Sequence, residues 1–290
     1  MSRIKNSLPG SRRFLKFGWV SVALLAAACA SDPGETHRAA LEAQREATTV
    51  DTLLRVAENT RAGGNGPAAV NLYRRAHLLD PERIEPLIEL GVTLNAMQAH
   101  RDAVDAFRAA LTLEPEHVGV LRELANTLLA LNQPNLAYAE FEKILKLNKA
   151  DVAALNGMGI ALDRLGDHDG AQTRYRQVLA LAPNSLAARN NLGLSMALAG
   201  KHEAAIALLQ EVANDPSATP RERQNLALAH GIAGDFEAAA KVARMDLDEA
   251  AVENNLAYYR YLQTLSGPAR ANAAMGGGSE TSEAAVTKGN

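Results

Sequence analysis

The chain has 290 residues, of which 47% are hydrophobic but only 4% aromatic, so its core must be built from closely packed small and aliphatic side chains. Its formal net charge is −3, and it falls to −8 when segment 1–28 is left out, because that segment holds five basic and no acidic residues. An acidic surface repels polyanions and disfavours nucleic-acid binding.

The N-terminal segment has the composition of a secretory signal peptide. Five basic residues precede the apolar run FGWVSVALLAAA over residues 17–28. Twelve apolar residues form a helix of roughly 18 Å, which is short of the ~30 Å that a bilayer core requires. We therefore expect residues 1–28 to be a signal peptide and the protein to be exported.

The single cysteine, Cys29, directly follows LLAAA. This junction resembles the lipobox of bacterial lipoproteins and implies lipid attachment (palmitate) at Cys29, with residues 29–49 as tether and spacer. Because Ala30 rather than aspartate follows the cysteine, the resemblance implies an outer-membrane lipoprotein that faces the periplasm. In the alternative, Ala28-Cys29-Ala30 is an ordinary cleavage site and the protein is soluble in the periplasm.

A period of 34 residues organises the rest of the chain. Pro81, Pro115 and Pro183 are separated by 34 and 68 residues. Before Pro115, the small and aromatic positions are Gly91, Ala103, Phe107 and Ala110, and before Pro183 they are Gly159, Ala171, Tyr175 and Val178. This pattern resembles the tetratricopeptide (TPR) repeat, in which two antiparallel helices form each unit.

The period predicts an all-α fold, an α-solenoid of about six TPR helix hairpins plus a C-terminal capping helix. The TPR domain spans 50–265, with repeats near 50–83, 84–117, 118–151, 152–185, 186–219 and 220–253 and a capping helix at 252–265. The sixth repeat is degenerate, because the motifs NNLG, QNLA and NNLA begin 34 and then only 30 residues apart. The tail 266–290 lacks apolar periodicity, and we expect it to be disordered.

The residue types at fixed repeat positions predict how the helices pack. Small residues such as Gly91, Gly159 and Gly193 allow close approach of two helix axes, and Phe107, Phe141 and Tyr175 fill the space between hairpins. The turns LGD (165–167), AGK (199–201) and AGD (233–235) place a glycine where a helix end requires a left-handed residue.

No enzymatic motif accompanies the repeats, since the chain contains no HExxH, GxSxG, P-loop or CxxC pattern. The triplet Asp167-His168-Asp169 is the best candidate for a metal site. We favour its interpretation as a solvated helix N-terminus, where acids complement the helix dipole. We therefore expect a non-enzymatic protein without metal, cofactor or small-molecule substrate.

Carboxamides recur on the first helices of the later repeats, at positions that face the inner wall of a TPR stack. They are candidates for a peptide-binding groove, because a carboxamide both donates and accepts hydrogen bonds and can pair with the backbone of an extended peptide. An equally weighted alternative is that they only bond neighbouring helices. The candidate residues are Asn156, Asn190, Asn191, Gln224, Asn225, Asn254 and Asn255.

The C-terminal stretch has the most specific resemblance to a known family. NNLGLSMALAGKHEAAIALLQEV and RQNLALAHGIAGDFEAAAKVARMDLDEAAVENNLAYYRYLQ resemble the TadD-type lipoproteins of tight-adherence (Flp) pilus systems over roughly residues 186–265. The resemblance implies a protein-interaction scaffold in pilus assembly and secretion, with the outer-membrane secretin or another assembly component as partner. The alternative is a periplasmic TPR adaptor for cell-wall enzymes or outer-membrane protein biogenesis.

Overall fold

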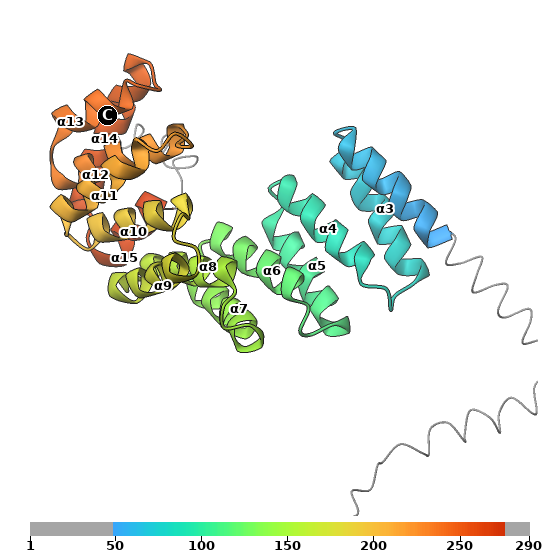
Figure 1. Cartoon of the computed structure of the whole chain (residues 1–290). Coiled ribbons are helices and arrows are strands. Elements are labelled where there is room, and N and C mark those ends of the chain that lie inside the picture. The colour runs from blue at the N-terminus through green and yellow to red at the C-terminus, as the bar shows by residue number, and fades with distance from the viewer. Residues whose placement is uncertain (1–48, 276–290) are drawn as a thin grey trace, which may run out of the picture. The chain divides into compact units, whose positions relative to one another are not determined.

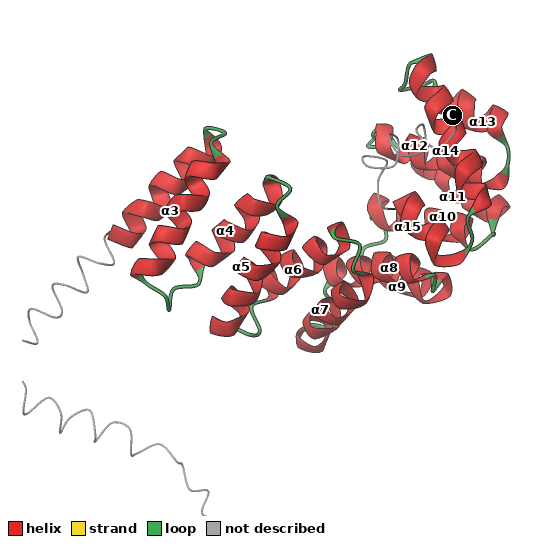
Figure 2. Cartoon of the chain, turned by 180° about the vertical axis from the view of Figure 1, so that it is seen from behind, coloured by secondary structure: helices red, strands yellow, loops and turns green. Residues whose placement is uncertain are grey.

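Every regular element between residues 49 and 275, the part of the chain that the computed structural model describes, is a helix (Figure 2). The chain divides at Thr52, and the described residues from Leu53 to Met275 belong to one compact unit. A first helix ends at residue 62. It is followed by α3 (Gly66–Leu79), α4 (Glu85–Ala96), α5 (His100–Leu113), α6 (Val118–Ala130), α7 (Pro134–Leu147), α8 (Val152–Leu165), α9 (His168–Leu181), α10 (Leu186–Leu198), α11 (His202–Ala213), α12 (Pro220–Ala233), α13 (Phe236–Ala243), α14 (Glu249–Thr264) and α15 (Gly267–Met275).

The helices pack in chain order, each against the next. The pairs α4–α5, α6–α7, α8–α9, α10–α11 and α12–α13 form hairpins, and the second helix of each of the first four hairpins also contacts the first helix of the next (Figure 1). This sequential packing confirms the predicted all-α solenoid. Each hairpin buries its apolar stripe only against its neighbours, so stability is shared along the stack.

Polar caps and glycines determine where the helices begin and end. The side chains of Asp151, Ser185 and Asp248 each accept a backbone N–H in the first turn of α8, α10 and α14. The predicted turn glycines Gly166, Gly200 and Gly234 have φ of 84°, 79° and 91°. These left-handed conformations are confirmed at all three turns, and a side chain there would be strained.

Close helix contacts depend on the small residues that the period predicts. A Cβ atom on Gly91 would lie 2.5 Å from the ring of Phe107, and one on Gly159 would lie 2.5 Å from the ring of Tyr175. Both rings are fully buried. A Cβ on Gly157 would lie 2.2 Å from Phe141, so this ring packs onto the first helix of the following repeat. Glycine therefore makes room for the aromatic side chain both within and between repeats.

The sixth repeat is shortened in its second helix. Helix α13 has eight residues, whereas α5, α7 and α9 have 14 each. This shortening accounts for the 30-residue interval between the last two motifs. Helix α14 then begins at Glu249, three residues before the predicted start of the capping helix.

The expectation of a wholly disordered tail is wrong for residues 267–275, which form α15. The local sequence pattern did not predict this helix, because contacts with other helices stabilise it. Helix α15 contacts α8 and α14, and Ala271 is fully buried. Residues 276–290 lie outside the described residues, as do the signal peptide, Cys29 and residues 30–48.

Candidate protein-interaction surface

Six of the seven predicted carboxamides join helices of successive repeats. Asn191 Nδ2 on α10 donates to Asn156 Oδ1 on α8 at 3.0 Å, and Asn225 Nδ2 on α12 donates to Asn190 Oδ1 on α10 at 3.0 Å. Asn190 Nδ2 in turn reaches Asn191 Oδ1 at 3.5 Å. The four side chains thus form one hydrogen-bonded series across α8, α10 and α12.

A carboxamide pair also joins α12 to α14. Asn255 Nδ2 donates to Gln224 Oε1 at 3.4 Å, and Gln224 Nε2 approaches Asp246 Oδ2 at 3.5 Å. At each of these three interfaces, the second carboxamide position of one repeat donates to the first position of the preceding repeat. We call the six side chains of these interfaces the carboxamide ladder.

Burial divides the ladder into two groups. Asn190 and Asn191 are 1% and 7% exposed, so their amides serve the interface between helices and offer little surface to a ligand. Gln224, Asn225 and Asn255 are half-buried, as is Asn156, and Asn254 beside the ladder is exposed. The side chains available to a partner are therefore concentrated on α12 and α14.

A second set of contacts between repeats is ionic. Arg122 pairs with Asp151 at 2.9 Å, and Arg189 pairs with Asp215 at 3.2 Å. Arg223 Nε donates to Asp246 Oδ2 at 2.8 Å, and this bond lowers the pKa of Asp246. In each case a cation on a first helix reaches the loop before the next first helix.

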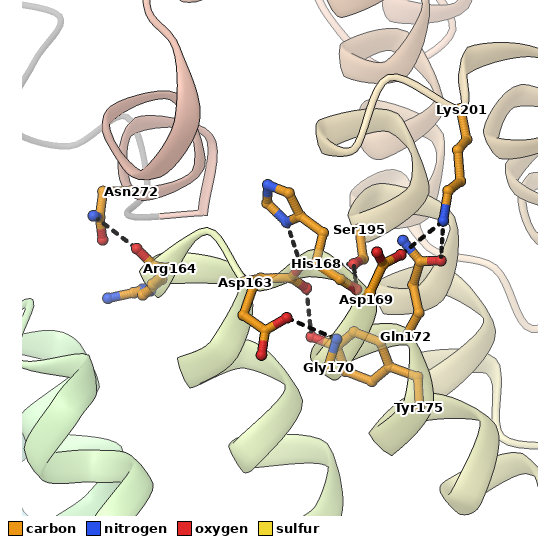
Figure 3. A network of polar contacts seen from close by, with 11 residues as sticks. Asp163, Arg164, His168, Asp169, Gly170, Gln172, Tyr175, Ser195, Lys201 and Asn272 are labelled. Carbon is orange, nitrogen blue, oxygen red and sulfur yellow. Dashed lines mark hydrogen bonds and ion pairs between the residues drawn. The ribbon is translucent and has the colours of Figure 1, made fainter.

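Asp163 is the centre of a buried polar network on α8 (Figure 3). Its carboxylate is 0% exposed; Oδ1 lies 2.7 Å from His168 Nδ1 and accepts Ser195 Oγ at 2.6 Å. Oδ2 accepts the hydroxyl of Tyr175 at 3.0 Å. Burial raises the pKa of Asp163, although its three hydrogen-bond partners act in the opposite direction. Burial and the nearby carboxylate raise the pKa of Tyr175 well above its ordinary value.

A similar network occurs two repeats earlier. Asn95 Oδ1 lies 3.0 Å from His100 Nδ1, and Asn95 Nδ2 donates to Thr127 Oγ1 at 2.7 Å. Adding 68 to each number gives Asp163, His168 and Ser195. Neither network was predicted from the sequence, although a polar triplet repeated at twice the period was a signal that could have revealed them.

The three side chains of the Asp167-His168-Asp169 triplet each have a different partner. Asp167 caps α9 by accepting the Gly170 N–H at 2.9 Å, His168 faces Asp163, and Asp169 pairs with Lys201 Nζ at 2.9 Å. Between residues 49 and 275, no three His, Cys, Asp or Glu side chains are grouped as a metal ion would need. Over the same range, no helix combines the length and hydropathy needed to cross a bilayer.

Comparison with known proteins agrees with the stacked hairpins. The tetratricopeptide repeat family matches residues 122–171 and 156–219. The chain thus contains tetratricopeptide repeats and has the fold of a TPR solenoid. Comparison with curated proteins finds no significant match.

Solved structures share the fold at low sequence identity. A tetratricopeptide repeat protein from Parabacteroides merdae ATCC 43184 has a TM-score of 0.69 at 14% identity, covering 83% of this chain and 98% of its own. MamA from Desulfovibrio magneticus RS-1 has a TM-score of 0.53 at 20% identity, covering 57% and 93%. Pseudomonas aeruginosa pilF has a TM-score of 0.53 at 16% identity, covering 68% and 90%. At these identities the likeness concerns the fold alone. The tetratricopeptide repeats themselves imply protein partners.

Proposed function

We propose that this TPR protein is a non-enzymatic, lipid-anchored scaffold that supports assembly or secretion of Flp/Tad pili by aiding the outer-membrane secretin. The observation that carries the proposal is the TadD-like stretch over residues 186–265, which corresponds to α10–α14. The same helices hold most of the carboxamide ladder. The part of the chain with the most specific resemblance is thus also the part with the most accessible carboxamides.

The chemistry of these side chains suits a peptide partner. A carboxamide has two N–H groups and an oxygen with two lone pairs, and the ladder bonds use only part of this capacity. Gln224, Asn225 and Asn255 are half-buried and Asn254 is exposed. Their remaining donors and acceptors suit the backbone of an extended segment, in a manner that depends little on its side chains.

Membrane attachment is proposed from Cys29 and its lipobox-like context. Cys29→Ser should abolish palmitate labelling and release the protein from the outer membrane. The matched control is Ala30→Ser, which leaves the thiol in place and should remain labelled and membrane-bound. Release of both variants, or labelling of Cys29→Ser, would refute lipid attachment at this cysteine.

The functional test is a gene deletion complemented with variants of the full chain. We expect the deletion to remove surface Flp pili and secretin multimers, and wild-type protein to restore both. Asn254→Ala with Asn255→Ala should restore them poorly, although helicity at 222 nm is unchanged. Normal pili and normal secretin multimers in the deletion strain would refute the proposal and favour the periplasmic adaptor for cell-wall or outer-membrane protein biogenesis.

A further inference from the structure

Helix α15 packs against α8 and α14, and it shares a buried apolar cluster with the first helices of the last repeats. Leu194 and Leu198 on α10 recur as Leu228 and Ile232 on α12, 34 residues later. Ala271 of α15 belongs to the same buried cluster as these four side chains and is fully buried itself. We call these four side chains, together with Arg164 at the end of α8, the α15 seat.

Polar contacts fix the position and direction of α15 on its seat. Arg270 Nε donates to the carbonyls of Leu262 and Leu265, at 3.1 and 2.8 Å, and so caps the C-terminal end of α14. The hydroxyl of Tyr258 donates to the carbonyl of Ala273 at 2.6 Å. Asn272 Nδ2 donates to the carbonyl of residue 164 at 3.0 Å (Figure 3).

Arg164 is a buried cation whose hydrogen-bond partners are backbone carbonyls. It is 9% exposed; Nη1 donates to the carbonyl of Leu129, in the last turn of α6, and Nη2 donates to the carbonyl of Met275, at the end of α15, at 2.9 Å. Its Nε is buried without a hydrogen-bond partner. Buried cations are usually paired with an anion, whereas this one is held by the negative ends of two helix dipoles. The site is therefore suited to receive the C-terminal end of a helix.

Helix α15 is too short to keep its structure alone. It has nine residues, far fewer than an isolated helix needs to be stable in water, so its structure depends on the seat. Of its side chains, only Ala271 is fully buried. The seat thus combines a repeated apolar stripe, room for a small side chain at position 271, and a cation at the C-terminal end.

We propose that the α15 seat is a binding surface for a short alanine-faced helix of the partner protein, and that this helix binds by displacing α15. The proposal rests on the proposed function, because it assumes a protein partner, and it adds the kind of segment recognised and its competitor. The partner helix carries a small residue where Ala271 lies, and its C-terminal carbonyls face Arg164. In the absence of a partner, α15 itself occupies the seat.

The test uses the full chain and a peptide of residues 266–275 labelled with fluorescein, acetylated at its N-terminus and amidated at its C-terminus. Ala271→Lys places a charge at the fully buried position of α15, whereas Ala269→Lys, on the exposed side of the same helix, is the matched control. Hydrogen exchange should accelerate at residues 267–275 in Ala271→Lys only. In fluorescence anisotropy, this variant should bind the peptide at least tenfold more tightly than wild type or the control.

The peptide is titrated to about 1 mM, since a tethered segment acts at an effective concentration in the millimolar range. A second variant, Arg270→Ala with Asn272→Ala, removes polar contacts without adding a charge. It should bind the peptide as tightly as Ala271→Lys is expected to, and it replaces that variant if Ala271→Lys misfolds. Equal binding by all forms, or no binding to a folded variant whose α15 exchanges rapidly, would overturn the proposal. Because no pilus is involved, this outcome is separate from failure of the genetic test.

Discussion

Replacement of Asp163 tests whether the buried network stabilises the stack. Asp163→Ala removes the acceptor of the Tyr175 and Ser195 hydroxyls and the partner of His168. Each buried group left unsatisfied costs about 1–3 kcal/mol, and relief of the buried carboxylate's desolvation offsets part of this loss. We expect a net loss of about 2–4 kcal/mol. For a domain of this size, that corresponds to a fall in Tm of roughly 5–15 °C.

The network around Asn95 supplies a matched prediction. Because Asn95 already bonds His100 and Thr127, the counterparts of His168 and Ser195, Asp163→Asn should cost less than about 1 kcal/mol. Its effect should also depend on pH. Burial raises the pKa of Asp163, so the folded state binds a proton that the unfolded state releases. Wild type therefore loses stability relative to Asp163→Asn as the pH rises from about 4 to 7.

The measurement is urea unfolding followed by circular dichroism at 222 nm, at pH 4 and pH 7, on wild type and both variants. The expected order at pH 7 places Asp163→Ala well below the other two forms. An Asp163→Ala variant within about 0.5 kcal/mol of wild type would refute the stabilising role. If Asp163→Asn is as damaging as Asp163→Ala, the proposed equivalence with Asn95 is wrong.

Three further substitutions test the contacts between repeats. Gly157→Leu drives a side chain into the ring of Phe141 and should cost about 3 kcal/mol or more in urea unfolding. Asn191→Ala breaks the middle of the carboxamide ladder and should cost about 1–2 kcal/mol by the same assay. The bond from Arg223 lowers the pKa of Asp246, so its contribution is present above the ordinary pKa of 3.8 and is lost as the pH falls through the folded-state pKa. Asp246→Asn should remove that part of the acid dependence of Tm.

Exposed positions serve as controls for these substitutions. A Cβ on Gly63 would meet only backbone carbonyls at 3.4 and 3.5 Å, so Gly63→Ala should change stability by less than about 1 kcal/mol. Asn254→Ala alters an exposed side chain beside the ladder and should not change the free energy of unfolding. If Asn191→Ala is equally silent, the ladder does not stabilise the stack.

The regular features of the fold were predictable because each repeat carries them in its own sequence. Helix ends follow from local residues such as Asp151 and Gly166, and the close approach at Gly159 follows from its place in the period. The carboxamides were also found by their spacing. Their pairing was open, since the same spacing suits a ligand or a neighbouring helix, and only the burial of Asn190 and Asn191 assigned those two to the helix interface.

The sequence by itself determined a stack of helical hairpins with a period of 34, since small residues and turn glycines act through neighbours one repeat away. The tertiary structure decided which polar groups are buried and what the C-terminal segment does. Asn272 meets residue 164 across 108 positions of the chain, and Arg164 meets Met275 across 111. Such contacts leave no trace in a local pattern, because their stability arises only when distant helices have already packed.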